Sequence, residues 1–394
     1  MTRPPDALNI HELREIARRR LPRWLFEFVD RGTEDEVALR NNRAAFERLK
    51  LDTQVLVDVS ARDLSTEVLG QRHRLPIGIA PTGAAGLLWY KGELELARAA
   101  KAAGIPFTLA TGSLTSMEEI ARDVGGTLWF QLYIWSDLAL SLKLVERAKN
   151  AGFEALVVTV DGPVPTNREY NVRNGFELPF RYTRRNTAQV LLHPRWFAGV
   201  LMRYVRDGGL PTRANYPEGE TESITRPTTT SRVRKNDSVS WEDLKRLREM
   251  WPGKLMLKGV LTATDAERAL EAGCDAVIVS NHGGRNFDSS MAPITVLPEI
   301  VDAVGSRTTV IVDSAFRRGS DIVKGLALGA DMVLVGRPTL WGITAGGEAG
   351  ARHAIGILEA EMSRTISYLG CTSVDQLARH MVRTVDTPHL PSRM

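Results

Sequence analysis

The stretch Ser-Asn-His-Gly-Gly-Arg-Asn-Phe-Asp at residues 280–288 combines residue types suited to proton transfer and anion binding. His282 can accept a proton near neutral pH, and Arg285, three residues later, is a permanent cation. The two glycines between them permit a sharp turn or a close approach to the backbone. A strand-to-helix turn with a solvated histidine would explain the same residues, so the rest of the chain must decide between the two interpretations.

Composition indicates a soluble globular protein, because 43% of the residues are hydrophobic and 25% are charged. The chain has two cysteines, Cys274 and Cys371, without CxxC spacing, which excludes a disulfide framework and a cysteine zinc site and fits a reducing compartment. We expect no metal site. The first 20 residues lack the apolar core of a signal peptide, and no run of about 18 apolar residues exists. A cytoplasmic protein without a membrane-spanning helix is therefore expected.

The positive charge of the chain is concentrated in one segment. The net charge is +4, and residues 174–238 hold 11 Arg and Lys against 6 Asp and Glu. The remainder of the chain is therefore close to neutral. No nucleic-acid-binding motif accompanies this charge, so we expect no nucleic-acid partner.

Eight short apolar runs recur along the chain and predict strands that are buried on both faces of a parallel sheet. Amphipathic helical patterns separate most of them, and eight such units favour a (β/α)8 barrel. A doubly wound open sheet is the alternative, but no GxGxxG follows the first run. The runs are residues 75–80, 107–111, 128–133, 155–161, 255–260, 276–281, 309–314 and 332–337.

Polar or special residues follow every predicted strand, at the end where such a barrel builds its active site. Any one of them could cap a strand, but capping does not explain a polar group at all eight ends. They are Pro81, Thr82, Gly83, Thr111, Gln131, Tyr133, Thr159, Asp161, Lys258, Ser280, His282, Arg285, Asp313, Arg317, Gly336 and Arg337.

The chemistry of these strand ends fits flavin mononucleotide (FMN). Lys258 would place a cation inside the barrel mouth, where it needs an anionic partner. Arg317 and Gly336–Arg337 follow strands seven and eight, where such barrels often bind a phosphate. These two groups match the two ends of FMN. The lysine would stabilise the reduced flavin ring at one end, and the arginines would bind the phosphate at the other.

The stretch at residues 280–288 and several other motifs of the chain resemble those of a known family. SNHGGRNFD is similar to the SNHGGRQLD signature of the FMN-dependent 2-hydroxy-acid dehydrogenases and oxidases. The resemblance continues through LPRWLFEFVDRGTEDE, APTG, WFQLY, TVDGPVPTNRE, LKG, VDSAFRRGSDIVKGLALGA and VGRP, and so spans nearly the whole chain. LHPRW and FRRGSDIV are most similar to the membrane-associated, mandelate-oxidising members of the family.

The resemblance implies a role for five residues. His282 would take the proton of the substrate's hydroxyl, and Asp161 would stabilise the resulting imidazolium. Arg285 would bind the substrate carboxylate in a two-point contact, with Arg168 as a second cation. Tyr133 would hydrogen-bond the substrate.

The resemblance also implies which residues surround the cofactor and the substrate. FMN would contact the strand ends, with Lys258 facing flavin N1, and Phe28 and Gly83 would border the substrate. The residues expected around FMN are Pro81, Thr82, Gly83, Thr111, Gln131, Thr159, Lys258, Ser280, Asp313, Arg317, Gly336 and Arg337.

The sequence departs from the family pattern at several of these positions. Phe28 stands where the family usually has a tyrosine, which removes a hydroxyl donor to the substrate. Ala110 replaces a common serine, and Ser314–Ala315 replaces the usual Gly-Gly. Gly112 and Pro165 stand where some relatives have larger side chains, so we expect a roomier pocket that accepts an aryl group.

The activity expected from the resemblance is oxidation of an (S)-2-hydroxy acid, mandelate-like or with another aryl or alkyl group, to the 2-oxo acid. The α-hydrogen would pass to flavin N5, and a membrane quinone or similar carrier would accept the electrons. Three alternatives remain open: an oxygen-using oxidase, an FMN barrel acting on a non-acid substrate such as an ester, alcohol or amine, and a catalytically silent barrel that binds a flavin or another ligand.

A long insertion interrupts the alternation after the fourth strand. We interpret residues 174–238 as a basic, partly mobile insertion on a single domain that spans residues 1–394. Residues 188–209 interleave apolar and aromatic residues with arginines, which indicates an interfacial segment on an anionic membrane. A surface helix packed on the barrel is the alternative. We expect a homotetramer peripheral on the inner face of the cell membrane, and no strand-end residue between Arg168 and Lys258.

Overall fold

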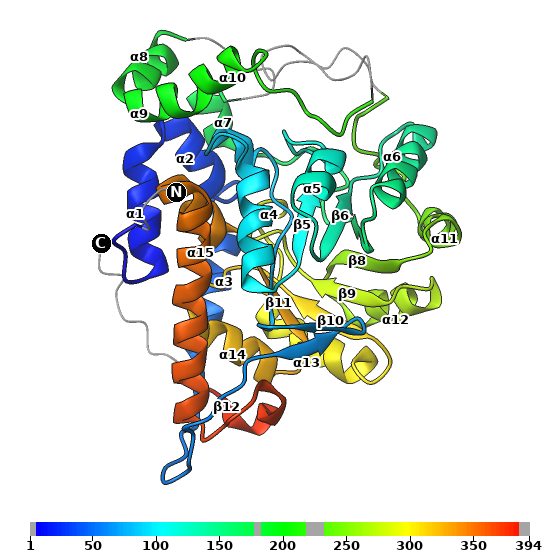
Figure 1. The fold of residues 1–394 in the computed structure, drawn as a ribbon. Coiled ribbons are helices and arrows are strands. Elements are labelled where there is room, and N and C mark those ends of the chain that lie inside the picture. Colours follow the sequence, from blue (N-terminus) through cyan, green and yellow to red (C-terminus); the bar gives the residue numbers. More distant parts are fainter. Residues whose placement is uncertain (1–4, 177–182, 218–231, 386–394) are drawn as a thin grey trace.

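Eight parallel strands close into a barrel, which confirms the predicted (β/α)8 architecture (Figure 1). This structure, a computed structural model, describes residues 5–176, 183–217 and 232–385. The strands follow one another in chain order, and β11 pairs with β4 to close the ring. They are β4 (Ile77–Ile79), β5 (Phe107–Ala110), β6 (Leu128–Leu132), β7 (Ala155–Thr159), β8 (Lys254–Val260), β9 (Ala276–Val279), β10 (Thr309–Val312) and β11 (Met332–Val335).

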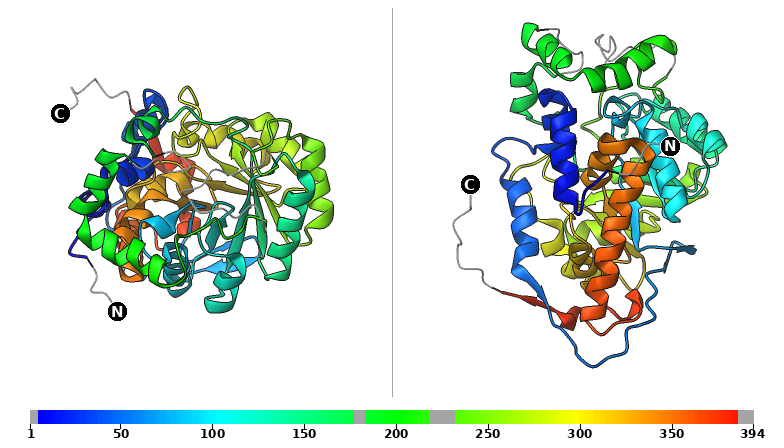
Figure 2. Two further views of the ribbon diagram at one scale, coloured as in Figure 1. Left: turned by 90° about the horizontal axis from the view of Figure 1, so that it is seen from above. Right: turned by 60° about the vertical axis from the view of Figure 1, so that its left-hand side comes forward.

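A helix follows each barrel strand and packs outside the barrel, so that helices surround the strands in the view from above (Figure 2). The longest, α15, bends at Gly346–Gly347, where the backbone leaves the helical conformation. These helices are α4 (Gly92–Ala103), α5 (Met117–Asp123), α6 (Leu138–Asn150), α11 (Trp241–Met250), α12 (Ala263–Glu271), α13 (Pro293–Val304), α14 (Gly319–Ala327) and α15 (Arg337–Tyr368).

The chain begins with three helices before it enters the barrel. A hairpin of β2 and β3 follows them, and β1 pairs antiparallel with β12 from the C-terminal part of the chain. These elements are α1 (Ile10–Arg20), α2 (Arg23–Asp30), α3 (Val37–Arg48), β1 (Leu49–Leu51), β2 (Thr66–Val68), β3 (Gln71–His73) and β12 (Val382–Thr384), with short turns η1 (Ala85–Leu87), η3 (Val374–Gln376) and η4 (Arg379–Met381).

The barrel interior is packed, and its side-chain rows lead directly to the predicted site. Trp129, Met256, Ile278 and Ile311 belong to one buried interior cluster, to which Val68 of β2 also belongs. Side chains two positions apart on a strand share a face, so the interior rows continue toward the C-terminal strand ends. Along β6 to β10 the next residues in these rows are Gln131, Thr159, Lys258, Ser280 and Asp313.

The insertion after β7 forms a helical layer at one end of the molecule, over α2 (Figure 1). Trp196 fixes this layer to the barrel, because its indole Nε1 donates to the carbonyl of Leu87 at 2.7 Å. Much of the segment predicted to be mobile lies outside the described residues. The helices are α7 (Glu169–Asn174), α8 (Arg184–Leu192), α9 (Pro194–Trp196), the π-helical turn η2 (Phe197–Leu201) and α10 (Met202–Arg206).

Candidate active site

A cavity of about 700 Å³ opens at the C-terminal ends of the barrel strands. Most of the residues predicted from sequence to form a site line it, although they come from distant parts of the chain. They are Phe28, Pro81, Thr82, Gly83, Gln131, Tyr133, Arg168, Lys258, His282, Arg285, Asp313, Arg317, Gly336 and Arg337.

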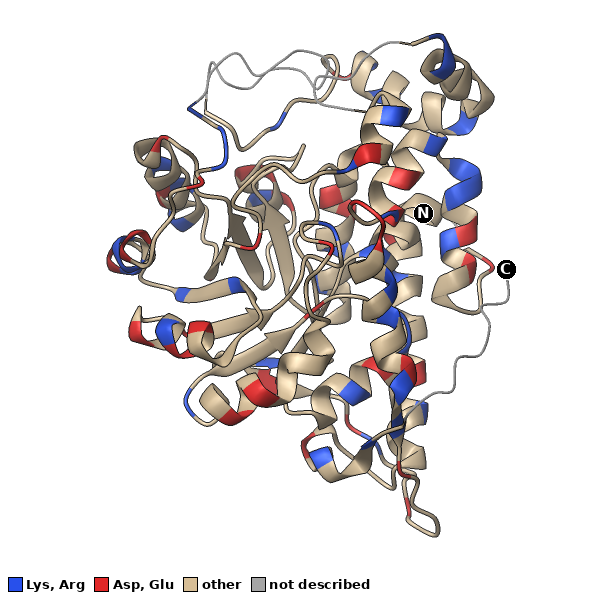
Figure 3. Ribbon diagram, turned by 180° about the vertical axis from the view of Figure 1, so that it is seen from behind, with Lys and Arg blue, Asp and Glu red and all other residues tan. Residues whose placement is uncertain are grey.

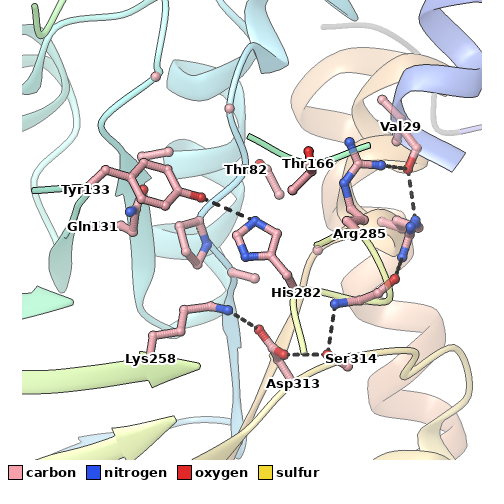
Figure 4. Close-up of a pocket in the computed structure, with 18 of the residues that line it drawn as sticks. Val29, Thr82, Gln131, Tyr133, Thr166, Lys258, His282, Arg285, Asp313 and Ser314 are labelled. Carbon is pink, nitrogen blue, oxygen red and sulfur yellow. Dashed lines mark hydrogen bonds and ion pairs between the residues drawn. The ribbon is translucent and has the colours of Figure 1, made fainter. Parts of the chain in front are cut away.

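His282 stands between the carboxylate of Asp161 and the phenol of Tyr133 in this cavity. Figure 4 shows its contact with Tyr133. Its Nδ1 lies 2.9 and 3.1 Å from the two carboxylate oxygens of Asp161. Since a carboxylate only accepts hydrogen bonds, Nδ1 carries the proton and Nε2 keeps its lone pair. The hydroxyl of Tyr133 donates to that Nε2 at 3.3 Å. The histidine is therefore held in the tautomer of a general base.

The electrostatics of this series favour a neutral histidine beside an ionised carboxylate. Burial lowers the pKa of His282, and the Asp161 charge opposes that shift. Burial alone would raise the pKa of Asp161, but the charges of His282 and Lys258 outweigh it and lower the pKa to about 2. Burial, together with the Asp161 charge, raises the pKa of Tyr133, so the phenol keeps its proton.

The loop after β9 is a tightly constrained turn and not a solvated connection. His282, Gly283 and Gly284 all have positive φ angles, of 58°, 67° and 71°. A Cβ atom on Gly284 would lie 2.6 Å from the backbone nitrogen of Leu39, so only glycine fits there. The conformation of His282 is strained for a non-glycine residue, and backbone strain of this kind is concentrated at active sites.

Two asparagines in the same loop hold the site, and neither is among the site residues predicted from the sequence. Asn286 donates from Nδ2 to the Oδ1 and the backbone carbonyl of Asp161, at 3.0 and 3.1 Å. It thereby orients the carboxylate that holds His282. Asn281 exchanges two amide hydrogen bonds with Asn42 of α3, at 2.8 and 2.9 Å. Nothing in the sequence itself pairs residues so far apart along the chain.

Arg285 and Arg168 present cations to the cavity without a carboxylate partner among the described residues. Arg285 donates from Nη1 to the carbonyls of Val29 and Arg31, at 3.3 and 2.9 Å, which fixes its direction. Its guanidinium lies 5.3 Å from the ring centre of Phe28, a cation–π contact at the position where a tyrosine is usual. Burial, together with the charge of Arg285, lowers the pKa of Arg168 to about 9. Two such cations favour a bound anion.

A closed series of polar contacts joins Lys258 to the histidine loop. Lys258 forms an ion pair with Asp313 at 2.9 Å and donates to Ser280 Oγ at 2.6 Å. Ser314 donates to Asp313 at 2.8 Å and accepts from the backbone N–H of Gly283 at 3.0 Å (Figure 4). The Oγ of Ser280 in turn accepts from the backbone N–H of His282 at 3.1 Å. The lysine and the histidine therefore share one framework.

The other end of the cavity is suited to an anion. Arg317 and Arg337 both line it, and the N-terminus of α15 begins at Arg337. Burial lowers the pKa of both arginines, that of Arg337 to about 10, and an anionic ligand would counter this effect. Nearby, Ser314 and Ala315 have φ angles of 81° and 67°. This left-handed backbone accounts for the glycines that usually occupy these two positions.

Four predicted site residues lie behind the cavity wall. Thr111 supports Gln131, because its Oγ1 donates to the Gln131 carbonyl at 2.7 Å. Asp161 and Ser280 contact His282 and Lys258 from behind, as described above. Thr159 is buried at the end of β7, and its Oγ1 has no partner among the described residues.

The insertion between Arg168 and Lys258 contributes residues to the cavity that the pattern of strand ends did not predict. Arg213 and Lys235, from the return leg of the insertion, line the cavity. Residues 232–236 run antiparallel to residues 134–137, with the Ser136 N–H donating to the Arg234 carbonyl at 2.8 Å. This pairing brings the Lys235 ammonium to 4.1 Å from the ring centre of Tyr133. No local pattern in the sequence predicts this contact, because it depends on the path by which a long insertion returns to the barrel.

Comparison with family models gives one match that covers almost the whole chain. Residues 17–384 match the family described as FMN-dependent dehydrogenase.

Individual relatives match with similar coverage. The chain is 42% identical to (S)-mandelate dehydrogenase of Pseudomonas putida, over 95% of this chain and 93% of that protein. It is 40% identical to L-lactate oxidase of a Nostoc species, over 96% of this chain and 98% of that protein. Among solved structures, one described as the monotopic membrane protein (S)-mandelate dehydrogenase superposes with a TM-score of 0.91 at 40% identity, covering 96% of this chain and 100% of that one.

Proposed function

The chain belongs to the FMN-dependent dehydrogenase family, and on that premise we propose that it oxidises an (S)-2-hydroxy acid with an aryl or apolar side chain to the 2-oxo acid. The observation that carries this proposal is the series Asp161–His282–Tyr133 beside two cations, Arg168 and Arg285. A base and a carboxylate-binding pair in one cavity are the two requirements of such a substrate.

His282 acts as the general base. Its Nε2 takes the proton of the substrate's hydroxyl, while the ionised Asp161 stabilises the imidazolium that forms. Asn286 keeps the carboxylate aligned with Nδ1 during this step. Tyr133 donates a hydrogen bond toward the same nitrogen and moves to the substrate oxygen when the substrate enters.

Arg285 and Arg168 bind the substrate carboxylate. Arg285 uses Nη1 for backbone carbonyls, and its Nε and Nη2 have no partner among the described residues. These two N–H directions suit a bidentate contact with a carboxylate. Arg168 in the cavity wall supplies a second positive charge. A bound carboxylate would stabilise its charged form, which burial disfavours. The absent hydroxyl at Phe28 therefore does not argue for a non-acid substrate.

The residues of the cavity fit FMN. The buried amide Nε2 of Gln131 has no hydrogen-bond partner among the described residues, as expected for a donor to the flavin's polar edge. Lys258 lies within the barrel mouth to stabilise the reduced ring, and Arg317 and Arg337 hold the phosphate. When bound, FMN supplies the oxidant, because N5 of its ring accepts the α-hydrogen together with two electrons.

The test is anaerobic reduction of the flavin-loaded protein by a matched set of compounds. (S)-Mandelate, lactate and glycolate each carry the required carboxylate and hydroxyl, whereas (R)-mandelate has the wrong configuration and methyl mandelate lacks the charge. We expect bleaching of the flavin colour by (S)-mandelate and little by the last two. Equal bleaching by the ester would favour the non-acid substrate, and no bleaching by any acid would favour a silent barrel.

The electron acceptor requires a separate measurement, because the chain is nearly as similar to an oxidase as to a dehydrogenase. We propose a membrane quinone or similar carrier. Turnover with a quinone or dye, without hydrogen peroxide, is expected. Stoichiometric peroxide formation in air would identify an oxygen-using oxidase instead.

We further propose that the helical layer of the insertion lies on an anionic membrane at the inner face of the cell membrane. Leu191 and Leu192 at the end of α8 are 70% and 76% exposed, and Met202 and Val205 of α10 in the same layer are also exposed. The helices of this layer carry several arginines, drawn in blue in Figure 3. Such a face suits the interface of an anionic bilayer. Among the described residues no helix is long and apolar enough to cross a membrane.

Sedimentation with vesicles that contain phosphatidylserine tests this surface. The full chain is expected to bind them at low salt and to dissociate as salt rises, because exposed charges are screened. Leu191→Ser with Leu192→Ser should weaken binding without loss of flavin reduction. The matched control is Val55→Ser with Leu56→Ser, two exposed residues that follow β1. The partner strand of β1, β12, lies at the end of the molecule away from the insertion (Figure 1). Equal binding by both variants would refute the surface.

The expected homotetramer stays a prediction. Light scattering of the purified protein in detergent, at several concentrations, measures its oligomeric state, and a monomer at all concentrations would contradict it.

A further inference from the structure

A second cavity of about 460 Å³ adjoins the main one and shares part of its wall. Phe28, Tyr133 and Arg168 line both cavities, so the second opens beside the place where the substrate would react. We call it the side chamber. Its far wall is apolar and aromatic, formed by Leu87, Leu114, Trp135, Val172, Phe176 and Tyr216.

Two glycines keep the junction between the cavities open. A Cβ atom on Gly83 would meet only the carbonyl oxygen of Gly112, at 3.8 Å, and one on Gly112 would meet nothing within 4 Å. Neither residue has a positive φ angle, so the backbone does not demand glycine at either position. Because neither residue has a side chain, the junction between the two cavities stays open.

The volume of the side chamber exceeds what a phenyl group needs. A buried apolar cavity of about 150 Å³ accommodates benzene, and the chamber is roughly three times as large. A mandelate ring would therefore leave most of it unfilled. Good complementarity requires a longer or substituted side chain.

The charge of the side chamber points to the nature of the substituent. Arg213 lies 5.0 Å from the ring centre of Tyr216 and donates to its hydroxyl at 3.2 Å. Lys235 lies over Tyr133 and donates to the Gly162 carbonyl at 3.4 Å. Neither cation pairs with a carboxylate among the described residues, and no Asp or Glu is among the described residues that line the chamber. Two unpaired cations against aromatic walls favour an aromatic ligand that carries an anion.

We propose that the side chamber binds the side chain of the substrate, and that it selects a 2-hydroxy acid whose aromatic ring carries an anionic group remote from the reacting carbon. This proposal rests on the proposed function, since it needs a carboxylate held by Arg285 at the reacting end. Arg213 pairs with the remote anion, and Lys235 adds a second charge beside the ring.

The experiment compares two acids that differ only in the remote anion. The flavin-loaded full chain is mixed anaerobically with (S)-mandelate or with (S)-4-carboxymandelate, and the apparent affinity is read from the concentration dependence of flavin reduction. A hydrogen bond to a charged group contributes about 1.5–3 kcal/mol, so 4-carboxymandelate should bind roughly 10- to 150-fold more tightly. Calorimetric titration with phenylacetate and 4-carboxyphenylacetate, which do not react, gives the same comparison without turnover.

Arg213→Met should reduce the ratio of the two affinities toward one, whereas Arg246→Met, at an exposed position of α11, should preserve that ratio. Gly112→Leu narrows the junction, and should weaken the binding of both mandelates relative to glycolate. Retained flavin absorbance and circular dichroism establish that each variant is folded.

Several results would overturn the proposal. If (S)-mandelate reduces the flavin and the 4-carboxyl group confers no advantage, the chamber does not select an anion, although the proposed function stands. If Arg213→Met leaves the preference intact, another group recognises the anion. If the variant alters only reoxidation by a quinone, the chamber serves the electron acceptor. If no 2-hydroxy acid reduces the flavin, the proposed function itself fails.

Discussion

Replacement of Asp161 by asparagine isolates the charge of the carboxylate that holds His282. In the protein, Oδ1 of Asp161 accepts from both His282 Nδ1 and Asn286 Nδ2, at 2.9 and 3.0 Å. An asparagine can place its single oxygen at the Oδ1 position and keep both hydrogen bonds, while its amide nitrogen replaces Oδ2, which lies 3.1 Å from His282 Nδ1. The change therefore removes a charge with little change of geometry.

The size of the effect follows from the distance between the charges. Two unit charges about 4 Å apart interact with about 4 kcal/mol at an effective dielectric constant of 20. That stabilisation is present only after His282 has taken the proton, so its loss raises the barrier of the proton-transfer step. Up to about 4 kcal/mol corresponds to a rate lower by up to about 10³-fold. Stopped-flow flavin reduction by (S)-mandelate at saturation measures it.

The pH dependence gives an independent check. The base must be neutral, so the reduction rate rises with pH through the pKa of His282. Burial lowers that pKa, and the Asp161 charge opposes the shift. Asp161→Asn removes the opposing charge, the pKa falls, and the acid limb of the profile moves to lower pH.

The control for a general loss of charge is Asp265→Asn. Asp265 lies in the first turn of α12, where its carboxylate accepts from Thr262. We expect the control to leave the rate and the profile close to those of the unaltered protein. A reduction rate within threefold of normal for Asp161→Asn, or an acid limb moved to higher pH, would refute the assigned role of the carboxylate.

Substitutions at three further positions test other parts of the site. Arg285→Lys should raise KM and lower kcat, since one ammonium cannot reproduce a bidentate contact, and steady-state kinetics with normal values would remove Arg285 from carboxylate binding. Lys258→Met should make the flavin's midpoint potential more negative, because it removes a charge that stabilises the reduced ring, and spectroelectrochemistry that shows no shift would contradict this. Ser314→Gly removes the strain of a positive φ angle, which costs about 1–2 kcal/mol in a non-glycine residue. The same change removes the hydroxyl contacts to Asp313 and Gly283, which contribute about as much stability. Its thermal stability should thus be near normal, whereas Ser314→Ala, which keeps the strain, should be less stable, and equal stability of the two variants would refute the strain.

The side chains that the strand ends present to the site could be predicted from the sequence, because alternate residues of a strand face the same side. Once Trp129 and Met256 are recognised as interior positions, Gln131 and Lys258 must share their face. The C-terminal location of barrel sites then brings these residues together. The closed barrel confirms the predicted fold and the family match confirms the predicted family, whereas the individual residue roles remain predictions.

The supporting residues could not be predicted, because their contacts join segments that no local pattern connects. Asn286 orients Asp161 across 125 residues, and Lys235 reaches Tyr133 only because the insertion returns beside β6. Thr111 shows what a strand-end position leaves open. The position predicts a contact with the cofactor, which stays a prediction, and the structure adds a hydrogen bond from its hydroxyl to the carbonyl of Gln131.

Single-turnover reduction of the His282→Gln variant tests the central claim most directly. Glutamine preserves hydrogen bonding near Asp161 but cannot act as a base, so the protein should still bind FMN and remain yellow. Mixed anaerobically with (S)-mandelate, the variant should reduce its flavin about 10²- to 10⁴-fold more slowly than the unaltered protein, the usual contribution of a general base. Flavin reduction by the variant at the unaltered rate would contradict the assignment of His282 as the base on which the proposed reaction depends.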